Sequence, residues 1–345
     1  MAGPYEHNFT MFGQSEYTIS PEDLKPISYA FIQGQRFPRV VEKSMGFGIH
    51  RSGWTDCIDA LSKTGIGAVI DDFVEQTFLA RQARTFHDED FVGFFHYPPD
   101  DDLPWFVPTD HDIRYSSMFG TLAWKRSSRR LKHAFTFTQR LAAWLRPFLD
   151  CPVTALKHPT STQVPRWSAA NFLANPKIVQ VGAFYRDTAS IYRLPTRLPK
   201  VRILDLRYDW IRQWDELVQK NFPVRDSAAK ILHIDRVSAE DYDDIFASSI
   251  IHTHYYAASA SNVVIECIAR KTPLLVNRTP GVVEYLGSEY PLYEDCLLDT
   301  PDAMSKLAIE AHKYLQKLAC GWLQHDVFIA NVRSSLGIDS IRKSV

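Results

Sequence analysis

From Ser261 to Gly287 the chain reads SNVVIECIARKTPLLVNRTPGVVEYLG. An apolar helical pattern carrying one acid, Glu266, is followed by a Lys-Thr-Pro turn, a short apolar run and a Pro-Gly turn that leads to a second acid, Glu284. A core helix has no need of a carboxylate, because burying a charge without a partner is costly. Glu266 is therefore expected either to face water or to bind a ligand.

The residues just before Glu266 favour a ligand as strongly as they favour a plain surface helix. An apolar strand pattern over Ile250–His254 leads into a loop of small residues that ends in Ser261 and Asn262. Such a loop at a helix start offers backbone N–H groups and the positive end of the helix dipole, which suit an anion. Glu266 lies about one turn inside that helix, where its carboxylate could accept hydrogen bonds from ribose hydroxyls. Spacing alone does not separate this interpretation from an ordinary capped helix with an exposed glutamate.

Strand-length apolar runs alternate with helical patterns along the whole chain, which is typical of parallel sheets in doubly wound α/β domains. In the first half the predicted strands are Ser28–Ile32, Gly46–His50, Ala68–Asp71, Phe91–His96, His133–Thr138 and Val153–Leu156, with helices at Thr55–Lys63 and Gln139–Arg146. In the second half the predicted strands are Lys177–Gly182, Ala229–Ile234, Ile250–His254 and Pro273–Asn277, with helices at Asp209–Asn221, Ala239–Ala247, around Glu266, at Val282–Leu286 and from Pro301 onward.

A polar, proline-bearing stretch, Lys157–Ser168, interrupts the alternation and is interpreted as an inter-domain connection. We therefore expect an N-terminal Rossmann-like domain over residues 1–170 and a C-terminal one over 171–325, with a last helix at about 326–345 packing back on the first domain. Open parallel sheets bind ligands beyond the carboxyl ends of their strands. A cleft between the two domains is thus the expected place for chemistry.

The composition is that of an ordinary globular protein. The chain has 345 residues, of which 45% are hydrophobic and 23% charged, and its net charge is −1. The balance of charge argues against a nucleic-acid partner. Five widely spaced cysteines without C-x-x-C spacing, no apolar N-terminal run and no window of membrane-spanning length predict a cytoplasmic protein without a membrane span.

The stretch around Glu266 resembles the donor-site signature of GT-B-fold glycosyltransferases, and the resemblance extends over most of Val237–Gly287. In that family a Glu-containing helix and a Thr-Pro strand lead to a Gly-containing loop that ends in Glu. The resemblance implies that Glu266 holds the donor ribose and that Ser261 and Asn262 lie against the diphosphate. It also implies that the loop with Gly281 and Glu284 borders the donor, which would be a UDP- or GDP-sugar used as co-substrate, with no metal and no other cofactor.

One position departs from the family pattern. Retaining members carry a further acid separated from the ribose glutamate by seven residues, and this chain has Ala258 there. The stereochemistry of transfer and the identity of the donor sugar are therefore left open.

Two glycine-bearing turns are similar to other parts of the family's donor site. The segment KIVQVGAFYRD places Arg186 after a predicted strand, where a guanidinium would neutralise the donor diphosphate. The alternative for Arg186 is a surface ion pair with Asp187 or another acid. In the first half, GFGIHRSGW resembles the family's N-terminal glycine loop, in which Gly53 would let the backbone approach the donor and His50 would supply a side-chain contact.

His96 is the leading candidate for chemistry in the first domain. It ends an apolar strand and precedes Pro98-Pro99, so its imidazole is expected at the carboxyl edge of the sheet, where related enzymes place a histidine near the transferred sugar. A satisfied strand-end histidine is the alternative. His50 and Asp71 are the further catalytic candidates, and the acidic run Asp100–Asp102 is interpreted as a solvated loop rather than a metal site.

The predicted activity is the transfer of a sugar from a nucleotide sugar to a hydroxyl of a glycan or small-molecule acceptor. Two alternatives remain. A non-hydrolysing sugar-nucleotide epimerase shares this fold and would use acids such as Asp71, Asp72 and Glu75 for proton transfer. A two-domain scaffold that has lost catalysis is the other, and Ala258 is the residue that suggests it.

Overall fold

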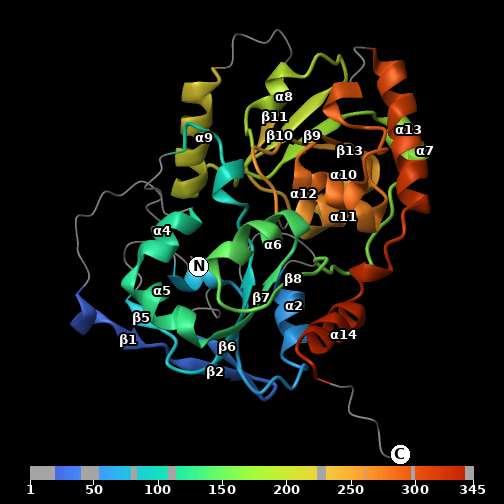
Figure 1. Ribbon diagram of the computed structural model, residues 1–345. Coiled ribbons are helices and arrows are strands. Elements are labelled where there is room, and N and C mark those ends of the chain that lie inside the picture. Colours follow the sequence, from blue (N-terminus) through green and yellow to red (C-terminus); the bar gives the residue numbers. More distant parts are fainter. Residues whose placement is uncertain are drawn as a thin grey trace, which may run out of the picture.

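The computed structural model describes residues 20–39, 54–78, 84–107, 114–223, 231–259, 261–296 and 300–338. These residues form two α/β domains, each built on a parallel sheet in the manner of a Rossmann fold (Figure 1). The predicted fold class is therefore confirmed. The predicted strand Gly46–His50 and the glycine-loop candidates His50 and Gly53 lie outside the described residues.

The first sheet has the order β4-β6-β7-β8, and all its described strands run parallel. Its strands are short apolar runs, and β4 and β6 are buried on both faces, as expected for a sheet covered by helices. They span β4 (Val69–Asp71), β6 (Phe91–Phe95), β7 (Leu131–Thr136) and β8 (Val153–Ala155). The helices of this domain are α2 (Trp54–Leu61), α3 (Val74–Phe78), α4 (Tyr115–Gly120), α5 (Leu122–Ser127) and α6 (Gln139–Leu145).

The predicted strand at the start of the chain belongs to a separate hairpin. β2 (Tyr29–Ile32) pairs antiparallel with β3 (Gln35–Pro38) in a two-stranded sheet. The turn residues Gln33 and Gly34 both have positive φ, 49° and 85°, which is the backbone that a tight two-residue hairpin requires. A second small sheet pairs β1 (Lys25–Pro26) with β5 (Thr85–Phe86).

The second sheet is wound outward in both directions from its first strand. Its order is β11-β10-β9-β12-β13 and every pairing is parallel. The strand order therefore reverses between β9 and β12, and in open α/β sheets ligands bind at such a switch point, outside the carboxyl ends of the strands. The strands are β9 (Ile178–Val181), β10 (Lys200–Ile203), β11 (Ile231–Ile234), β12 (Ile250–Thr253) and β13 (Leu274–Val276).

Strand β10 was not predicted from the sequence, because Lys200 and Arg202 break its apolar run. Both side chains are nevertheless buried. Lys200 donates to the carbonyl of Leu194 at 2.7 Å, and Arg202 forms a buried ion pair with Asp215. Each charge thus has a local partner that lets a basic strand lie inside the sheet.

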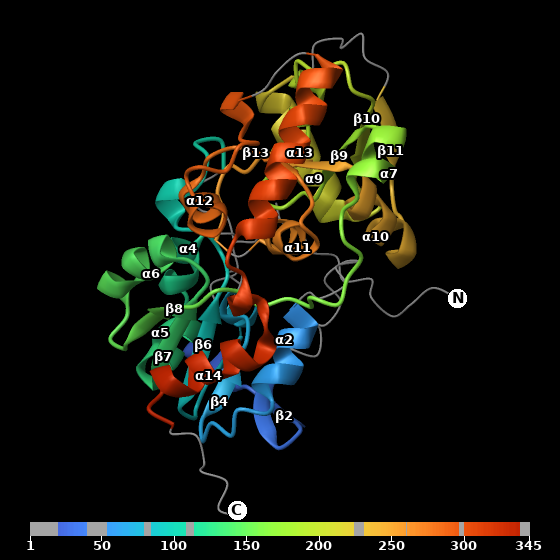
Figure 2. The same ribbon diagram turned by 90° about the vertical axis from the view of Figure 1, so that its right-hand side faces the viewer.

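Helices cover both faces of the second sheet, and one helix returns to the first domain. They are α7 (Ala169–Ala174), α8 (Ser190–Arg193), α9 (Asp209–Asn221), α10 (Ala239–Ser248), α11 (Asn262–Arg270), α12 (Pro280–Leu286) and α13 (Pro301–Lys317). The last described helix, α14 (His325–Ser335), lies beside α2 in the first domain (Figure 2). Its Phe328 packs against Trp54, and Arg333 donates to the backbone carbonyl of Thr64.

The carboxyl ends of the two sheets meet through a shared aromatic core. Tyr97, which follows β6, packs edge-on against Tyr185, which follows β9, with ring centroids 5.6 Å apart. Tyr185 in turn contacts Trp214 of α9. This arrangement brings the strand ends that carry the predicted site residues to one inter-domain region.

No helix within the described ranges is both long and apolar enough to cross a membrane.

Candidate functional site

Arg186 lies at the switch point of the second sheet. Gly182, at the end of β9, has φ of 84°, and its missing side chain makes room for the guanidinium, since a Cβ there would overlap the Arg186 head group. The guanidinium carbon lies 5.0 Å from the centre of the Tyr255 ring, and Nη2 is 3.4 Å from the Tyr255 hydroxyl. The loops after β9 and β12 therefore bring Arg186 and Tyr255 together.

The alternative of a surface ion pair with Asp187 is not what the structure has. Asp187 pairs with Arg193 instead. Arg186 itself forms no ion pair with any described acid, and its buried Nε has no hydrogen-bond partner among those residues. A half-buried cation without a local counter-charge is a candidate binding group for an anion.

The N-terminus of α11 lies next to this cation. The Ser261 hydroxyl is hydrogen-bonded to the Tyr255 hydroxyl and does not cap its own helix. Asn262 is the first residue of α11. The first-turn amides thus have no side-chain cap, and together with the helix dipole they add to the positive potential set by Arg186.

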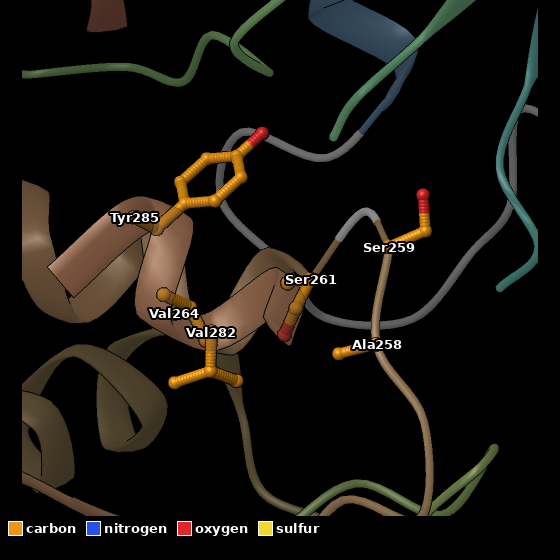
Figure 3. A pocket seen from close by; sticks show the side chains of 7 residues that line it. Ala258, Ser259, Ser261, Val264, Val282 and Tyr285 are labelled. Atoms are coloured by element: carbon orange, nitrogen blue, oxygen red, sulfur yellow. The ribbon is translucent and has the colours of Figure 1, made fainter. Parts of the chain in front are cut away.

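A narrow pocket lies between α11, α12 and the loop that follows β12. It is lined by Ala258, Ser259, Ser261, Val264, Gly281, Val282 and Tyr285. Figure 3 shows Ala258 and Ser259 on the loop, across from the helices that carry Ser261, Val264, Val282 and Tyr285, with the Ala258 side chain pointing toward those helices. Gly281 is needed here because a Cβ would overlap the carbonyl oxygen of Ala258.

Glu266 is buried and turned toward the neighbouring helix α10. Its side chain is 1% exposed, its Oε2 accepts the Tyr242 hydroxyl at 2.7 Å, and Arg270 Nη1 is 3.8 Å away. Arg270 also pairs with Asp243. The charge of the Glu266 carboxylate is therefore balanced by neighbouring groups of the protein, and Glu266 lies about one helical turn from the pocket residue Ser261.

Glu284 bonds to the first domain. Its two carboxylate oxygens accept the backbone N–H groups of Gln139 and Arg140 at 2.7 and 2.9 Å, which are the first two residues of α6. The next residue, Tyr285, donates its hydroxyl to the carbonyl of Phe137 at 2.9 Å. In this arrangement α12 joins the domains, and the Glu284 carboxylate binds the start of α6.

His96 lies at the carboxyl edge of the first sheet, in a group of aromatic rings. It contacts Trp54, Phe73 and Phe137 at centroid distances of 4.6, 4.1 and 4.8 Å. Its Nε2 is 2.8 Å from the backbone carbonyl of Asp72, so Nε2 carries the hydrogen and Nδ1 keeps its lone pair. Burial lowers the pKa of His96 to about 3, and the imidazole is neutral at physiological pH.

Asp71 lies beneath the sheet edge, where three groups donate to it. Its side chain is fully buried on β4, and it accepts from Thr77 Oγ1, the Phe73 amide and His87 Nε2, the last at 2.8 Å. These three hydrogen bonds indicate that Asp71 stabilises the carboxyl end of β4.

Asp72 is the acid nearer to His96. It accepts from Trp54 Nε1 at 2.7 Å, and burial, with the charge of Asp71, holds the pKa of Asp72 well above its usual range.

The side chains of the acidic run after Pro98-Pro99 bind the helices α4 and α6 of the first domain. Asp100 accepts the amides of Tyr115 and Ser116 at the start of α4, and Asp102 forms an ion pair with Arg140. Asp101 accepts from Trp144 Nε1. In the described part of the chain no group of three or more His, Cys, Asp or Glu side chains is placed to hold a metal ion.

Sequence reasoning missed residues that complete these groups through long-range contacts. Tyr255 links Arg186 to Ser261, and Tyr242 holds Glu266. His158, which the sequence already places beside the inter-domain cleft, packs on the same Trp54 ring as His96, with ring centroids 5.1 Å apart. Tyr255 directly follows the predicted strand Ile250–His254, and this position at a strand end could have identified it as a candidate.

No family model matches this chain, and no curated protein is detectably similar to it in sequence. Solved structures are similar. Sucrose-phosphate synthase from Thermosynechococcus elongatus superposes with a TM-score of 0.52 at 14% identity, over 79% of this chain and 74% of that chain. A trehalose-6-phosphate synthase gives 0.49 at 10% identity, over 83% and 76%. The UDP-forming trehalose-phosphate synthase from Burkholderia vietnamiensis gives 0.48 at 12% identity, over 72% and 68%.

The chain has the GT-B fold of glycosyltransferases. At these identities the likeness establishes the fold, and the activity has to be argued from the chain's own residues.

Proposed function

We propose that this protein is a glycosyltransferase that moves a sugar from a nucleoside-diphosphate sugar to a hydroxyl of a glycan or small-molecule acceptor. The observation that carries the proposal is the unneutralised guanidinium of Arg186 at the β9/β12 switch point, beside the uncapped N-terminus of α11. A cation and a helix N-terminus that converge on one point suit a diphosphate.

The donor diphosphate would lie between Arg186 and the first amides of α11, next to Ser261 and Asn262. As the bond to the sugar breaks, negative charge grows on the leaving nucleoside diphosphate. Fixed donors in a water-poor site stabilise such charge strongly, because they need no reorganisation when the reaction occurs. These groups supply that charge stabilisation without a metal, so we expect transfer to persist in the presence of EDTA.

Glu266 remains the proposed ribose acceptor, and it must exchange a partner to act. Its place one turn inside α11 supports the role, while the Tyr242 hydroxyl now occupies one of its oxygens. A ribose hydroxyl would replace or share that bond. Gly281 would border the same space, because its lack of a side chain keeps the Ala258 loop close. Glu284 would contribute indirectly, by holding α12 to the first domain.

His96 is the proposed group of the first domain that meets the transferred sugar or the reacting hydroxyl. With Nε2–H bonded to Asp72, only Nδ1 remains to contact a ligand, and it accepts a hydrogen bond. A neutral imidazole can orient a hydroxyl or receive its proton in the transition state.

Binding of the donor is tested by calorimetry with UDP, GDP and their glucose and N-acetylglucosamine derivatives. We expect one nucleotide series to bind the parent and Arg186→Ala to bind it about 10–100-fold more weakly, since a charge-assisted bond to phosphate is lost. Arg193→Ala, which removes a neighbouring arginine paired with Asp187, is the matched control. Failure of the parent to bind any nucleotide would support the non-catalytic scaffold instead.

The epimerase is a second candidate because two buried acids, Asp72 and Glu75, lie beside His96 with raised pKa values, that of Glu75 about 7. A carboxyl group that exchanges its proton near neutral pH, as Glu75 does, suits epimerisation as well as transfer. Incubation with UDP-N-acetylglucosamine and no acceptor separates the two, because only an epimerase converts the sugar while it stays attached to the nucleotide.

A further inference from the structure

Glu75 is a buried acid on the short helix α3, directly behind the strand end that carries His96. Its side chain is only 2% exposed. Burying a carboxyl group is costly unless hydrogen bonds compensate it. The hydrogen-bond partners of Glu75 therefore indicate the role of this buried acid.

A single oxygen of Glu75 holds the turn that follows β6. Oε1 accepts the backbone N–H of His96 at 2.6 Å and that of Tyr97 at 2.8 Å, and it also accepts the Tyr115 hydroxyl. The next two residues are Pro98 and Pro99, which have no N–H to donate. Glu75 thus accepts both backbone N–H groups that this segment can donate before Pro98 and Pro99.

The other bond that orients His96 comes from the same loop. The carbonyl of Asp72, three residues before Glu75, accepts Nε2–H of the imidazole at 2.8 Å. The segment from Asp72 to Glu75 therefore holds His96 at its backbone through Glu75 and at its ring through Asp72. Among the described residues, the Nδ1 atom of His96 forms no hydrogen bond.

We propose that Glu75 is the positioning residue for His96, fixing the His96–Tyr97 turn so that Nδ1 is presented to the bound substrate. This inference rests on the proposed function of His96 and goes beyond it, because it gives a role to a residue outside the donor-site motif. Glu75 touches no substrate itself. It acts through the backbone to which it is bonded.

The charge of Glu75 makes this support depend on pH. Burial raises its pKa to about 7, against the lowering effect of the hydrogen bonds from Tyr115, Tyr97 and His96. Tyr185 of the second domain also faces Glu75, and Asp100 and Arg114 of the first domain lie near Tyr185. The ionised carboxylate is the stronger acceptor. The turn is therefore held more firmly above pH 7 than below it.

The test compares Glu75→Gln and Glu75→Ala with Glu310→Gln, a matched change at an exposed site on α13. The first measurement needs no activity. In protein labelled with ¹⁵N-histidine, the His96 signal is assigned by its loss in His96→Gln, and its ring shifts report the tautomer. We expect the parent to show one fixed Nε2–H tautomer and Glu75→Ala to show a mixture, with a His96 pKa closer to the ordinary value.

The second measurement is turnover. We expect Glu75→Ala to lower kcat about 10-fold or more with little change in the donor KM, as for a group that acts only in the transition state. Glu75→Gln keeps an acceptor oxygen, so it should recover part of kcat, and it should lack the rise of kcat through pH 7 that we expect of the parent. If Glu75→Ala does not fold, the His96 tautomer, the His96 pKa and kcat are compared with the parent in Tyr115→Phe and Glu75→Gln instead.

The two proposals fail separately. An unchanged His96 tautomer and pKa in both Glu75 variants overturns the positioning role, whatever the activity. A parent that transfers no sugar overturns the proposed function, while the nuclear magnetic resonance result still decides whether Glu75 orients His96.

Discussion

The carboxylate of Glu284 accepts the backbone N–H of Gln139 at 2.7 Å, across the boundary between the domains. Gln139 begins α6, whose side-chain cap is Thr138, so the helix start receives a neutral cap from its own domain and a charged one from the other. A carboxylate at a helix N-terminus is stabilised by the helix dipole. The acid that resembles a donor-site residue thus fastens the second domain to the first.

Removing this carboxylate should loosen the contact between the domains. We expect Glu284→Ala to lower the free energy of unfolding by about 1–2 kcal/mol, the usual range for a lost helix cap with a favourable charge. Chemical denaturation measures the loss, and hydrogen exchange at Gln139 and Arg140 locates it. Glu289→Ala, at an exposed acid nearby, is the control. Unchanged exchange at the α6 amides would contradict the bond.

Gly281 should not tolerate even one added methyl group. A Cβ at this position overlaps the Ala258 carbonyl, which is backbone and cannot rotate away. We expect Gly281→Ala to destabilise the protein by about 1–3 kcal/mol, as overpacking does, and to weaken donor binding by shifting the Ala258 loop. Gly120→Ala is the control, since nothing lies within 4 Å of its added Cβ. Equal melting temperatures for the two variants would show that the loop moves at no cost.

His96→Ala should reduce turnover more than binding. A group that contacts the reacting atoms in the transition state contributes about 10²-fold or more to kcat, with a smaller effect on the donor KM. His233→Ala removes an exposed histidine on the edge strand β11 and should leave both constants unchanged. Near-parental kcat at saturating substrates would make His96 structural and direct attention to His50, Asp71 and His158.

Glu266→Gln should separate the ligand role of this residue from its structural one. The amide oxygen still accepts the Tyr242 hydroxyl, so we expect the variant to fold, and the lost charge should weaken donor binding about 10-fold or more. Both changes remove a counter-charge from the buried Arg270, but Glu266→Ala also removes the acceptor of the Tyr242 hydroxyl and should lower the melting temperature further. Calorimetry and thermal unfolding measure the two effects. If Glu266→Gln binds the donor with the affinity of the parent, Glu266 does not bind the ribose through its charge and the assignment is wrong.

Acid should destabilise the protein through His158. Burial lowers the pKa of this histidine from 6.5 to about 4, and its Nδ1–H donates to the carbonyl of Pro159 at 2.7 Å. The unfolded chain therefore binds a proton below pH 6.5 that the folded chain does not, and stability falls between pH 6.5 and 4. Over that window His158 should cost about 3 kcal/mol.

His158→Asn keeps a donor for Pro159 and removes the titration. Its free energy of unfolding should decline less than that of the parent as the pH falls from 6.5 to 4, which urea denaturation at several pH values can measure. A difference between parent and variant that stays constant with pH would mean that His158 is not held neutral.

The order of the elements could be predicted from the sequence because it depends on local patterns. The strand ends at Asp71 and His96 and the helix around Glu266 follow from apolar periodicity within a few residues. Long-range partners leave no such pattern. The direction of the Glu284 carboxylate depends on an α6 amide 145 positions away in the sequence, and Glu266 turns to Tyr242 because another helix presents a hydroxyl there.

Two segments of the chain pass between the domains, residues 156–168 and residues 318–324. They lie together, since the Thr160 amide donates to the Leu323 carbonyl at 2.9 Å. Two adjacent crossings restrict relative motion of the domains more than a single crossing would, because separating the domains must displace both segments together. A molecule that touches both domains then has less domain freedom to remove when it binds, so less entropy is lost. Cutting either crossing should weaken ligands that bridge the domains and spare those that contact only one.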